Sequence, residues 1–121
     1  MKNRLLITGA TGMVGTALRA LVPRAIPISS HQFDLKRSAQ CSSMFAHYEP
    51  ESIIHLAAKV GGIKSNTDYV GDFYKDNILI NTNVLDAAKK HGTKKVISLL
   101  STCIYPDKVT YPLTEDQIHN G

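Results

Sequence analysis

The sequence is poor in cysteine and has no long apolar run, and both absences exclude classes of protein. Its two cysteines, Cys41 and Cys103, stand alone, so we expect neither a metal site nor the disulfide framework of a small secreted protein. No apolar run approaches the roughly 18 residues that a membrane span needs. The apolar stretch near the N-terminus, Leu5–Ile7, is too short for the core of a signal peptide. We therefore expect a cytoplasmic protein that does not bind membranes.

The sequence also lacks the features of a nucleic-acid-binding module. It has no zinc-finger spacing, no aromatic RNA-binding signature and no basic stripe, although 14 lysines and arginines against 10 acidic residues give a formal net charge of +4. Two lysine pairs, Lys89–Lys90 and Lys94–Lys95, flank Gly92 at a predicted helix end, where cations are stabilised. We expect no nucleic-acid partner, and the modest positive charge suits ligands that carry phosphates.

What the sequence does contain is an alternation of apolar strands and amphipathic helices. Its 121 residues, 43% hydrophobic and 20% charged, fit one globular domain. Continuous apolar runs, as in buried parallel strands, predict strands at residues 4–8, 52–57 and 95–100. A weaker strand is predicted at residues 25–29, where Pro27 favours the edge of the sheet.

Apolar residues at helical spacing predict three helices between these strands. The first runs from Val14 to Leu21, the second covers residues 38–48, and the third covers residues 72–91. After the third helix, Gly92 is placed for a C-terminal cap, and one face of that helix carries Tyr74, Ile78, Leu85 and Ala88. The chain from residue 101 onward is predicted to be loop. Strands that alternate with helices indicate an α/β fold, a doubly wound parallel sheet of the Rossmann type.

Three glycines connect the first predicted strand to the first helix. In the stretch Thr8–Gly15 they occupy positions 9, 12 and 15. In a dinucleotide-binding turn the first glycine allows the tight turn, the second lets the backbone approach a pyrophosphate, and the third allows close helix–strand packing. The helix that follows directs its free N–H groups at the phosphates. A tight turn without a ligand is the alternative, but the position between a strand and a helix favours the dinucleotide.

The spacing Thr-Gly-x-x-Gly-x-x-Gly resembles the loop of the extended short-chain dehydrogenases/reductases, which act mainly on nucleotide sugars. Further features resemble that family in the same order along the chain. They are Asp34–Leu35, at the position that holds adenine, His55–Ala58, at the strand end that lies along the cofactor, and the asparagines Asn77 and Asn83 on the long helix. Each is unspecific alone, since Ala57–Ala58 fits plain packing and Asn77 fits a solvent-facing residue. Their ordered occurrence is specific.

The resemblance implies that the chain binds NADP. A carboxylate at the end of the second strand usually binds the ribose of NAD, whereas this chain has Ser29-Ser30-His31 there, which favours NADP. Members of this family often carry an arginine or lysine nearby, and here only His31 stands at that place, where it fits an exposed loop residue equally well. The cofactor-binding residues that the resemblance implies are Gly9, Thr11, Gly12, Met13, Val14, Gly15, Ser30, His31, Asp34, Leu35, Ala57, Ala58, Leu99, Leu100 and Thr102.

Two residues after the last predicted strand are candidates for catalysis. In this family a hydroxyl at that strand's end hydrogen-bonds the reacting carbonyl, and Ser101 is at the matching position. Cys103, together with Lys59–Ile63, resembles the members that both epimerise and reduce a GDP-linked 4-keto sugar. The resemblance implies that Cys103 is the acid/base of epimerisation, a role open to a thiol because its pKa is readily lowered near positive groups. A small buried loop residue is the alternative for Cys103, whereas Cys41 fits core packing.

The loop after the third predicted strand completes the implied site. The resemblance implies that Val60, Gly61 and Gly62 contact the GDP-sugar substrate, with a simple turn as the alternative. The family's catalytic Tyr-x-x-x-Lys pair is not among the 121 residues, because neither Tyr105 nor Tyr111 is followed by a lysine four positions later.

The resemblance therefore implies that residues 1–121 are the N-terminal part of an NADP-binding Rossmann domain, incomplete at its C-terminal side. It further implies that the substrate domain is absent, that these residues alone are inactive, and that the whole enzyme is a homodimer. Two alternatives stay open. One is another nucleotide-sugar epimerase, dehydratase or reductase of the same superfamily, and the other is a non-catalytic dinucleotide-binding module.

Overall fold

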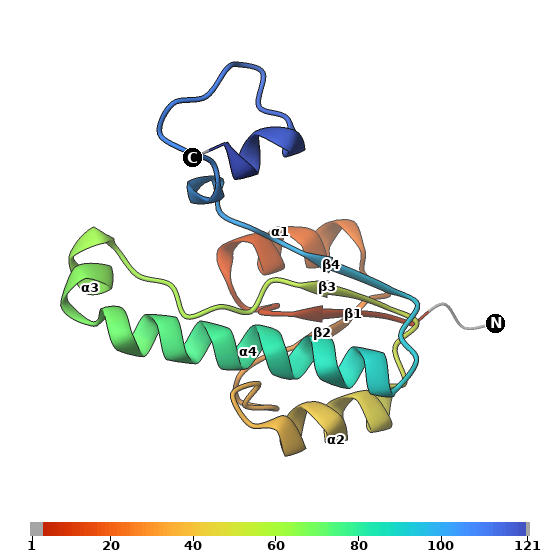
Figure 1. The fold of residues 1–121 in the computed structure, drawn as a ribbon. Helices are drawn as coiled ribbons and strands as arrows, with labels where there is room; N and C mark the ends of the chain where they lie inside the picture. Colours follow the sequence, from red (N-terminus) through yellow and green to blue (C-terminus); the bar gives the residue numbers. More distant parts are fainter. Residues whose placement is uncertain (1–3, 121) are drawn as a thin grey trace.

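Four parallel strands form one sheet in the computed structural model, which describes residues 4–120. They are β1 (Leu5–Thr8), β2 (Ile26–Ile28), β3 (Ser52–His55) and β4 (Lys95–Ser98), and their order across the sheet is β2-β1-β3-β4. Figure 1 shows β1 inside the sheet, with helices on both faces. The predicted α/β fold with a parallel sheet is confirmed.

Strand β2 lies at the edge of the sheet, as Pro27 predicts. Pro27 is opposite Ile7 of β1, and Ile7 is opposite Ile54 of β3 on its other side. Proline has no N–H to donate, so it is tolerated in a strand that has a neighbour on one side only. The inner strand β1 carries no proline, and its Leu6 and Ile7 are fully buried.

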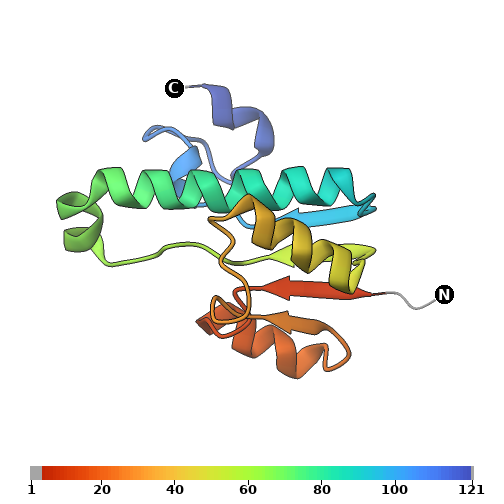
Figure 2. The ribbon, with the colours of Figure 1, turned by 90° about the horizontal axis from the view of Figure 1, so that it is seen from below.

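Helices cover the sheet unequally. Within the described residues these are α1 (Met13–Leu21), α2 (Ser38–Tyr48), α3 (Ile63–Asp68) and α4 (Val70–Lys90). Figure 1 shows α1 on one face of the sheet and the long helix α4 with α2 on the other. Figure 2, turned by 90°, shows α2 beside the C-terminal half of α4, with which it packs.

The hydrophobic core lies between the sheet and the layer formed by α2 and α4. Its buried side chains come from the strands (Leu6, Ile28, Ile53), from α2 (Cys41, Met44, Phe45) and from α4 (Val84, Ala87, Ala88). Cys41 is fully buried, which confirms its prediction as a core residue. Because this layer fixes α4 against the sheet, it also fixes the polar side chains that α4 carries beyond the core.

The apolar faces predicted for two helices are wrong in part. On α4 the core side is formed by Val84, Ala87 and Ala88, with Ile80 packed against them, whereas the predicted Tyr74, Ile78 and Leu85 are exposed. The sheet covers the C-terminal half of α4, and the N-terminal half extends past the strands (Figure 1). On α1, Val14 and Leu21 are exposed and Gly15 is the buried residue, because this helix contacts the glycine turn through its backbone.

Element boundaries follow the prediction closely for the helices and less closely for the strands. Helix α2 spans the predicted residues 38–48, and α4 differs from its prediction by two residues at the start and one at the end. Strands β3 and β4 end together at the pair His55 and Ser98, so Leu99 and Leu100 are exposed and outside the sheet. The sequence analysis did not predict the short helix α3. Two 3₁₀ helices, Thr102–Ile104 and Glu115–His119, occupy the segment predicted as loop.

The C-terminal cap predicted for the long helix is present. Gly92 has φ +71°, the left-handed conformation that glycine adopts without strain. The chain turn that follows lets Thr93 N–H donate to the Ala88 carbonyl at 2.9 Å, which satisfies one of the free carbonyls at the helix end.

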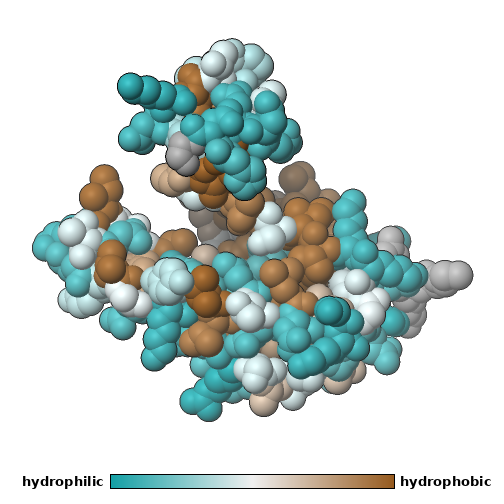
Figure 3. All heavy atoms as spheres, viewed as in Figure 1, coloured by the Kyte–Doolittle hydropathy of each residue, from teal (hydrophilic) through white to brown (hydrophobic). Residues whose placement is uncertain are grey.

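Apolar side chains are also exposed outside the core. Leu99 is 58% and Leu100 is 74% exposed, and Ile97 of β4 is 43% exposed. Figure 3 shows apolar surface over β4 and the segment that leads from it to the C-terminal residues. None of the helices within residues 4–120 is long and apolar enough to cross a membrane.

Candidate functional site

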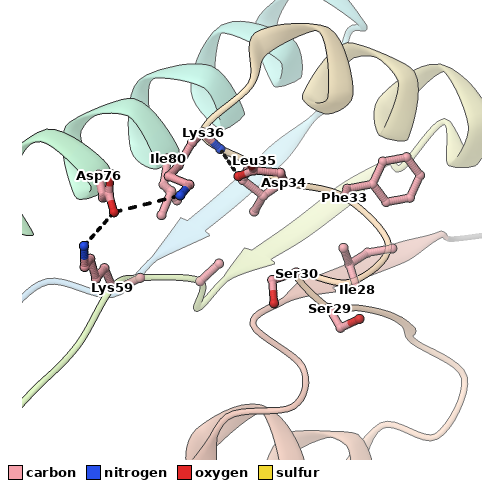
Figure 4. A pocket seen from close by; sticks show the side chains of 12 residues that line it. Ile28, Ser29, Ser30, Phe33, Asp34, Leu35, Lys36, Lys59, Asp76 and Ile80 are labelled. Atoms are coloured by element: carbon pink, nitrogen blue, oxygen red, sulfur yellow. Dashed lines mark hydrogen bonds and ion pairs between the residues drawn. The ribbon is translucent and has the colours of Figure 1, made fainter. Parts of the chain in front are cut away.

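A cavity of about 390 Å³ opens at the carboxyl edge of the sheet, beside the ends of β2 and β3. Three segments surround it: residues 28–36 from the last residue of β2 onward, residues 57–59 after β3, and Asp76 with Ile80 on α4 (Figure 4). The chain leaves β1 towards β2 on one side and returns to β3 on the other. In open α/β sheets, ligands bind in the crevice at such a reversal of strand order.

The fold requires glycine at two of the three glycine positions in the turn next to this cavity. Gly9 has φ +65°, and a Cβ atom there would lie 2.8 Å from the backbone nitrogen of Ala57. A Cβ atom on Gly15 would overlap the Gly9 carbonyl oxygen and lie 2.7 Å from Ala10 Cα. At Gly12 the nearest atom would be 3.3 Å away. The fold therefore constrains Gly12, the position that a pyrophosphate would approach, less than Gly9 and Gly15.

A buried hydrogen-bond network joins the ends of β1 and β3 to helix α4. His55 is 3% exposed; its Nδ1 lies 2.7 Å from Thr8 Oγ1, and its Nε2 lies 3.0 Å from Asn81 Oδ1. Thr8 Oγ1 also accepts the N–H groups of Leu56 and Ala57 at 3.2 and 3.3 Å. Because those two N–H groups occupy the oxygen's lone pairs, the Thr8 hydroxyl hydrogen donates to Nδ1, and Nε2–H donates to Asn81.

The same network favours neutral His55. Burial lowers the pKa of His55 below its ordinary value, against the opposing effect of the hydrogen bond to Asn81. A second proton on the ring would face the Thr8 oxygen, whose lone pairs already accept two N–H groups. Neutral His55 thus helps to position the chain after β3 at Ala57, which lies against Gly9 of the glycine turn.

The loop at Asp34–Leu35 is fixed through one carbonyl. Leu35 O accepts from Asn83 Nδ2 of α4 at 3.0 Å and from the Cys41 thiol at 3.4 Å. Burial, with a smaller effect of Asp34, raises the pKa of the Cys41 thiol to about 11, so it remains protonated and able to donate. Asp34 N–H donates to Gln40 Oε1, also on α2. These bonds hold the Asp34 side chain at the cavity wall.

The loop after β3 is held by helix α4 in a similar way. Asn77 accepts from Lys59 N–H at 2.8 Å and donates to Lys59 O and Phe73 O at 2.9 Å. Figure 4 shows Asp76 between the ammonium groups of Lys59, at 2.9 Å, and Lys36, at 4.0 Å. The hydrogen bond from Lys59 is the largest of the effects that lower the pKa of Asp76. One carboxylate therefore connects the loops on opposite sides of the cavity.

Ser101 and Cys103 share a turn after β4. Ser101 begins the first 3₁₀ helix, and its Oγ accepts from Cys103 N–H at 3.1 Å. This bond uses a lone pair of the oxygen, so the hydroxyl hydrogen is free to donate to another group. Both side chains are exposed. The turn can therefore offer a hydroxyl donor and a thiol to one ligand outside the sheet.

The structure brings together about half of the predicted site residues. Ser30, Asp34, Leu35, Ala57 and Ala58 line the large cavity. Thr11 lines a smaller cavity beside it, and the glycine turn lies against Ala57. Neither of these two cavities is lined by His31, Met13, Val14, Val60, Gly61, Gly62, Leu99, Leu100, Ser101, Thr102 or Cys103.

Several residues at the site were missed by the sequence analysis. Phe33 and Ile80 form apolar wall, Lys36 and Asp76 form the ion pair across the cavity, and Asn81 holds His55. Ile80 and Asn81 are next to the predicted Asn77 and Asn83 on α4, but a polar residue on an exposed helix has no pattern that marks its partner. Lys36 directly follows the predicted pair Asp34–Leu35, so its place in the sequence could have identified it as a site residue.

Comparisons with known proteins agree with this geometry. A sequence model of the NAD dependent epimerase/dehydratase family matches residues 5–121. A probable GDP-L-fucose synthase of Drosophila melanogaster is 44% identical over 98% of this chain and 39% of its own length. A GDP-L-fucose synthase of Dictyostelium discoideum is 42% identical over 99% of this chain and 40% of its own length. The chain thus spans about two fifths of the curated relatives it matches.

A solved structure supports the same relationship. A crystal structure of a GDP-L-fucose synthetase from Naegleria fowleri, bound to NADP, is 38% identical to this chain with a TM-score of 0.87. The alignment covers 99% of this chain and 38% of that one. The fold of this chain is therefore shared with a segment of a protein whose crystal structure contains NADP.

Proposed function

Because the chain belongs to the NAD dependent epimerase/dehydratase family, we propose that it forms the NADP-binding part of a GDP-L-fucose synthase. The observation that carries the proposal is the glycine turn, which lies against Ala57 of the cavity wall: at Gly9 and Gly15 an added Cβ atom would overlap backbone atoms, whereas at Gly12 its nearest neighbour would be the Gly9 carbonyl oxygen at 3.3 Å. The identity of 42–44% to GDP-L-fucose synthases supports the substrate class. Residues 1–121 are then one part of the dinucleotide-binding domain, and the enzyme's activity belongs to the larger protein.

In this proposal the large cavity holds the adenosine half of NADP. Ile28, Ala57 and Ile80 offer apolar surface to the adenine ring. The Asp34 carboxylate at the cavity wall, whose Oδ1 already accepts from Lys36 N–H at 3.1 Å, accepts from the adenine amino group in this proposal. Ser30 faces the ribose, and the free N–H groups at the start of α1 face the pyrophosphate. When bound, NADPH supplies the hydride for reduction of the 4-keto group.

Ser101 and Cys103 act on the sugar in this proposal. Epimerisation beside a ketone removes a proton from carbon and returns one on the opposite face, so it requires an acid/base group at the sugar. The Cys103 thiol supplies that group. The Ser101 hydroxyl donates to the 4-keto oxygen, which acquires negative charge both when a neighbouring carbon is deprotonated and when the carbonyl is reduced. Its placement one turn from Cys103 serves both steps on one substrate.

The loop Val60–Gly62 contacts the sugar nucleotide in this proposal. Its position is fixed from behind: Asn77 holds Lys59, and a Cβ atom at Gly61 would lie 2.9 Å from Phe73 Cζ. Gly62 has nothing within 4 Å of an added Cβ, so its exposed side is open to a ligand.

We also propose that the enzyme is a cytoplasmic homodimer. Two free cysteines, one of them exposed, suit a reducing compartment. The exposed residues Tyr74, Ile78 and Leu85 along α4 offer an apolar surface to a second copy. Sedimentation of the enzyme purified from its source tests the dimer directly.

Calorimetry and isotope exchange test the main proposal. The protein is expected to bind NADPH, and the enzyme that carries this segment is expected to convert GDP-4-keto-6-deoxymannose to GDP-L-fucose. In that enzyme, Cys103→Ser should slow uptake of solvent deuterium at C3 and C5 more than hydride transfer, whereas Ser101→Ala should slow both steps. Normal deuterium uptake in Cys103→Ser would assign the cysteine a structural role.

A further inference from the structure

Arg19 of α1 stands beside the smaller cavity, which adjoins the larger one at the end of β2. This cavity measures about 210 Å³, and its lining residues are Ala10, Thr11, Arg19, Pro27, Ile28, Ser29 and Gln32. Ile28 and Ser29 line both cavities, so only the last residues of β2 and the start of its loop separate them. A ligand in the larger cavity can therefore extend a substituent past Ser29 into the smaller one.

The polar groups around the smaller cavity are mainly hydrogen-bond donors. Gln32 Oε1 accepts from Ser29 N–H at 2.9 Å and lies 3.2 Å from the Ser29 hydroxyl. Because a backbone N–H can only donate, the oxygen of the Gln32 amide faces Ser29 and its NH₂ group is left for another partner. Thr11 contributes a hydroxyl and Arg19 a guanidinium. Within residues 4–120, no carboxylate lines this cavity. Its chemistry suits an anion.

Arg19 has no ion-pair partner within the described residues. Its charge alone needs no ligand, since a cation in the last turn of a helix is stabilised by the helix dipole. The dipole does not account for its position on the cavity wall. Side chains on a helix lean towards its N-terminus, and Thr11 of the smaller cavity lies in that direction, just before the start of α1. Arg19 is thus a charged group that an anionic ligand could pair.

We infer that Arg19 recognises the 2′-phosphate of NADP and that the smaller cavity receives this phosphate. The inference rests on the proposed function, in which the adenosine occupies the larger cavity with its ribose at Ser29 and Ser30. The 2′-hydroxyl side of the ribose is the side that the end of the second strand meets in these folds. Arginine suits a phosphate because its planar guanidinium forms two parallel charge-assisted hydrogen bonds.

The inference replaces His31 in the role that the sequence analysis gave it. The side chains of His31 and Arg19 are both exposed, but His31 lines neither of the two cavities, whereas Arg19 lines the smaller one. Arg19 lies 12 positions earlier in the sequence, on helix α1, and lines the smaller cavity together with Ile28 and Ser29 at the end of β2. The preference for NADP then has two physical causes: the positive charge of Arg19 and the absence of a carboxylate at the end of β2.

Calorimetric titrations of four forms of the protein test the inference: wild type, Arg19→Gln, His31→Gln and Arg24→Gln. Each is titrated with NADPH and NADH, and with the smaller probes 2′,5′-ADP and 5′-AMP, which differ in the 2′-phosphate alone. Arg24 is the matched control, since it is an exposed arginine that follows the same helix and lines neither cavity.

Arg19→Gln should weaken binding of NADPH and 2′,5′-ADP about 10- to 100-fold, the range for loss of hydrogen bonds between charged groups. Binding of NADH and 5′-AMP should change less than about twofold, and Arg24→Gln and His31→Gln should keep the wild-type ratio of the two affinities. Arg19→Lys, which retains the charge without the planar guanidinium, should give an intermediate ratio.

Two results would overturn the inference, and they differ in whether the proposed function is also overturned. An unchanged NADPH-to-NADH ratio in Arg19→Gln, especially with a lowered ratio in His31→Gln, would remove Arg19 from the 2′-phosphate and leave the proposed function intact. Failure of the wild-type protein to bind either dinucleotide would overturn the proposed function, and the assignment of Arg19 with it.

Discussion

The two glycines at positions 12 and 15 should respond to the same small substitution in opposite ways. A methyl group on Gly15 would overlap the Gly9 carbonyl oxygen and lie 2.7 Å from Ala10 Cα. These are backbone atoms of the turn and cannot rotate away, so the helix must shift. Overpacking of this kind costs about 1–3 kcal/mol. We expect Gly15→Ala to lose that amount from the free energy of unfolding, measured by urea denaturation.

A methyl group on Gly12 has a different environment. Its nearest neighbour would be the Gly9 carbonyl oxygen at 3.3 Å, and the φ of −74° at Gly12 suits any residue. An alanine variant has fewer accessible conformations in the unfolded state than glycine, which stabilises the folded protein by about 0.4–1 kcal/mol. Alanine is a poorer N-cap than glycine by a comparable amount, so the two effects offset each other. The free energy of unfolding of Gly12→Ala should therefore stay within about 1 kcal/mol of the wild-type value.

The cost at Gly12 should instead appear in binding. If the pyrophosphate approaches the backbone here, the methyl group overlaps the ligand, and the same overpacking of about 1–3 kcal/mol weakens NADPH binding about 5- to 150-fold. Calorimetry of both variants separates the two effects. Unchanged NADPH affinity in Gly12→Ala would refute the placement of the pyrophosphate, and wild-type stability of Gly15→Ala would refute the packing argument.

Three further predictions concern groups around the cavity. The folded state lowers the pKa of His55, so the contribution of neutral His55 to the free energy of unfolding should be complete above the ordinary histidine pKa of about 6.5 and fall as the pH drops below it. Urea denaturation should show a smaller pH dependence of the free energy of unfolding in His55→Gln. Asn77→Ala removes three side-chain hydrogen bonds to backbone groups, two of them at Lys59, and should lower the free energy of unfolding by about 1–3 kcal/mol. Iodoacetamide at pH 7.5 should label exposed Cys103 in the folded protein, and mass spectrometry should find Cys41 labelled only after denaturation, because burial raises its pKa to about 11.

The sequence was a good guide where local patterns decide the structure. The apolar runs predicted the strands, Pro27 predicted the edge, and Gly92 predicted the helix end. The glycine turn was predictable from its spacing between a strand and a helix, and Gly9 has the left-handed φ that glycine adopts without strain. These signals lie within one element or at one junction, so a single sequence contains them.

The helix faces were harder to predict because they depend on how far the sheet extends. Tyr74, Ile78 and Leu85 have helical spacing, yet the sheet covers the part of α4 that carries Val84 and Ala87. Periodicity identifies an apolar stripe and does not say which neighbouring element covers it. Likewise, β4 ends where its partner β3 ends, although the apolar run continues through Leu100.

The polar contacts at the site could not be predicted because each depends on two segments that are distant in sequence. Thr8 and His55 are 47 positions apart, and Asn83 reaches the Leu35 carbonyl over 48 positions. In each case a residue on one strand or helix fixes the main chain of a loop that faces the cavity. The cavity wall is therefore determined by side chains that mostly do not line it. For this reason we expect substitutions at Asn77, Asn83 and His55 to alter nucleotide affinity without removing any direct contact with the ligand.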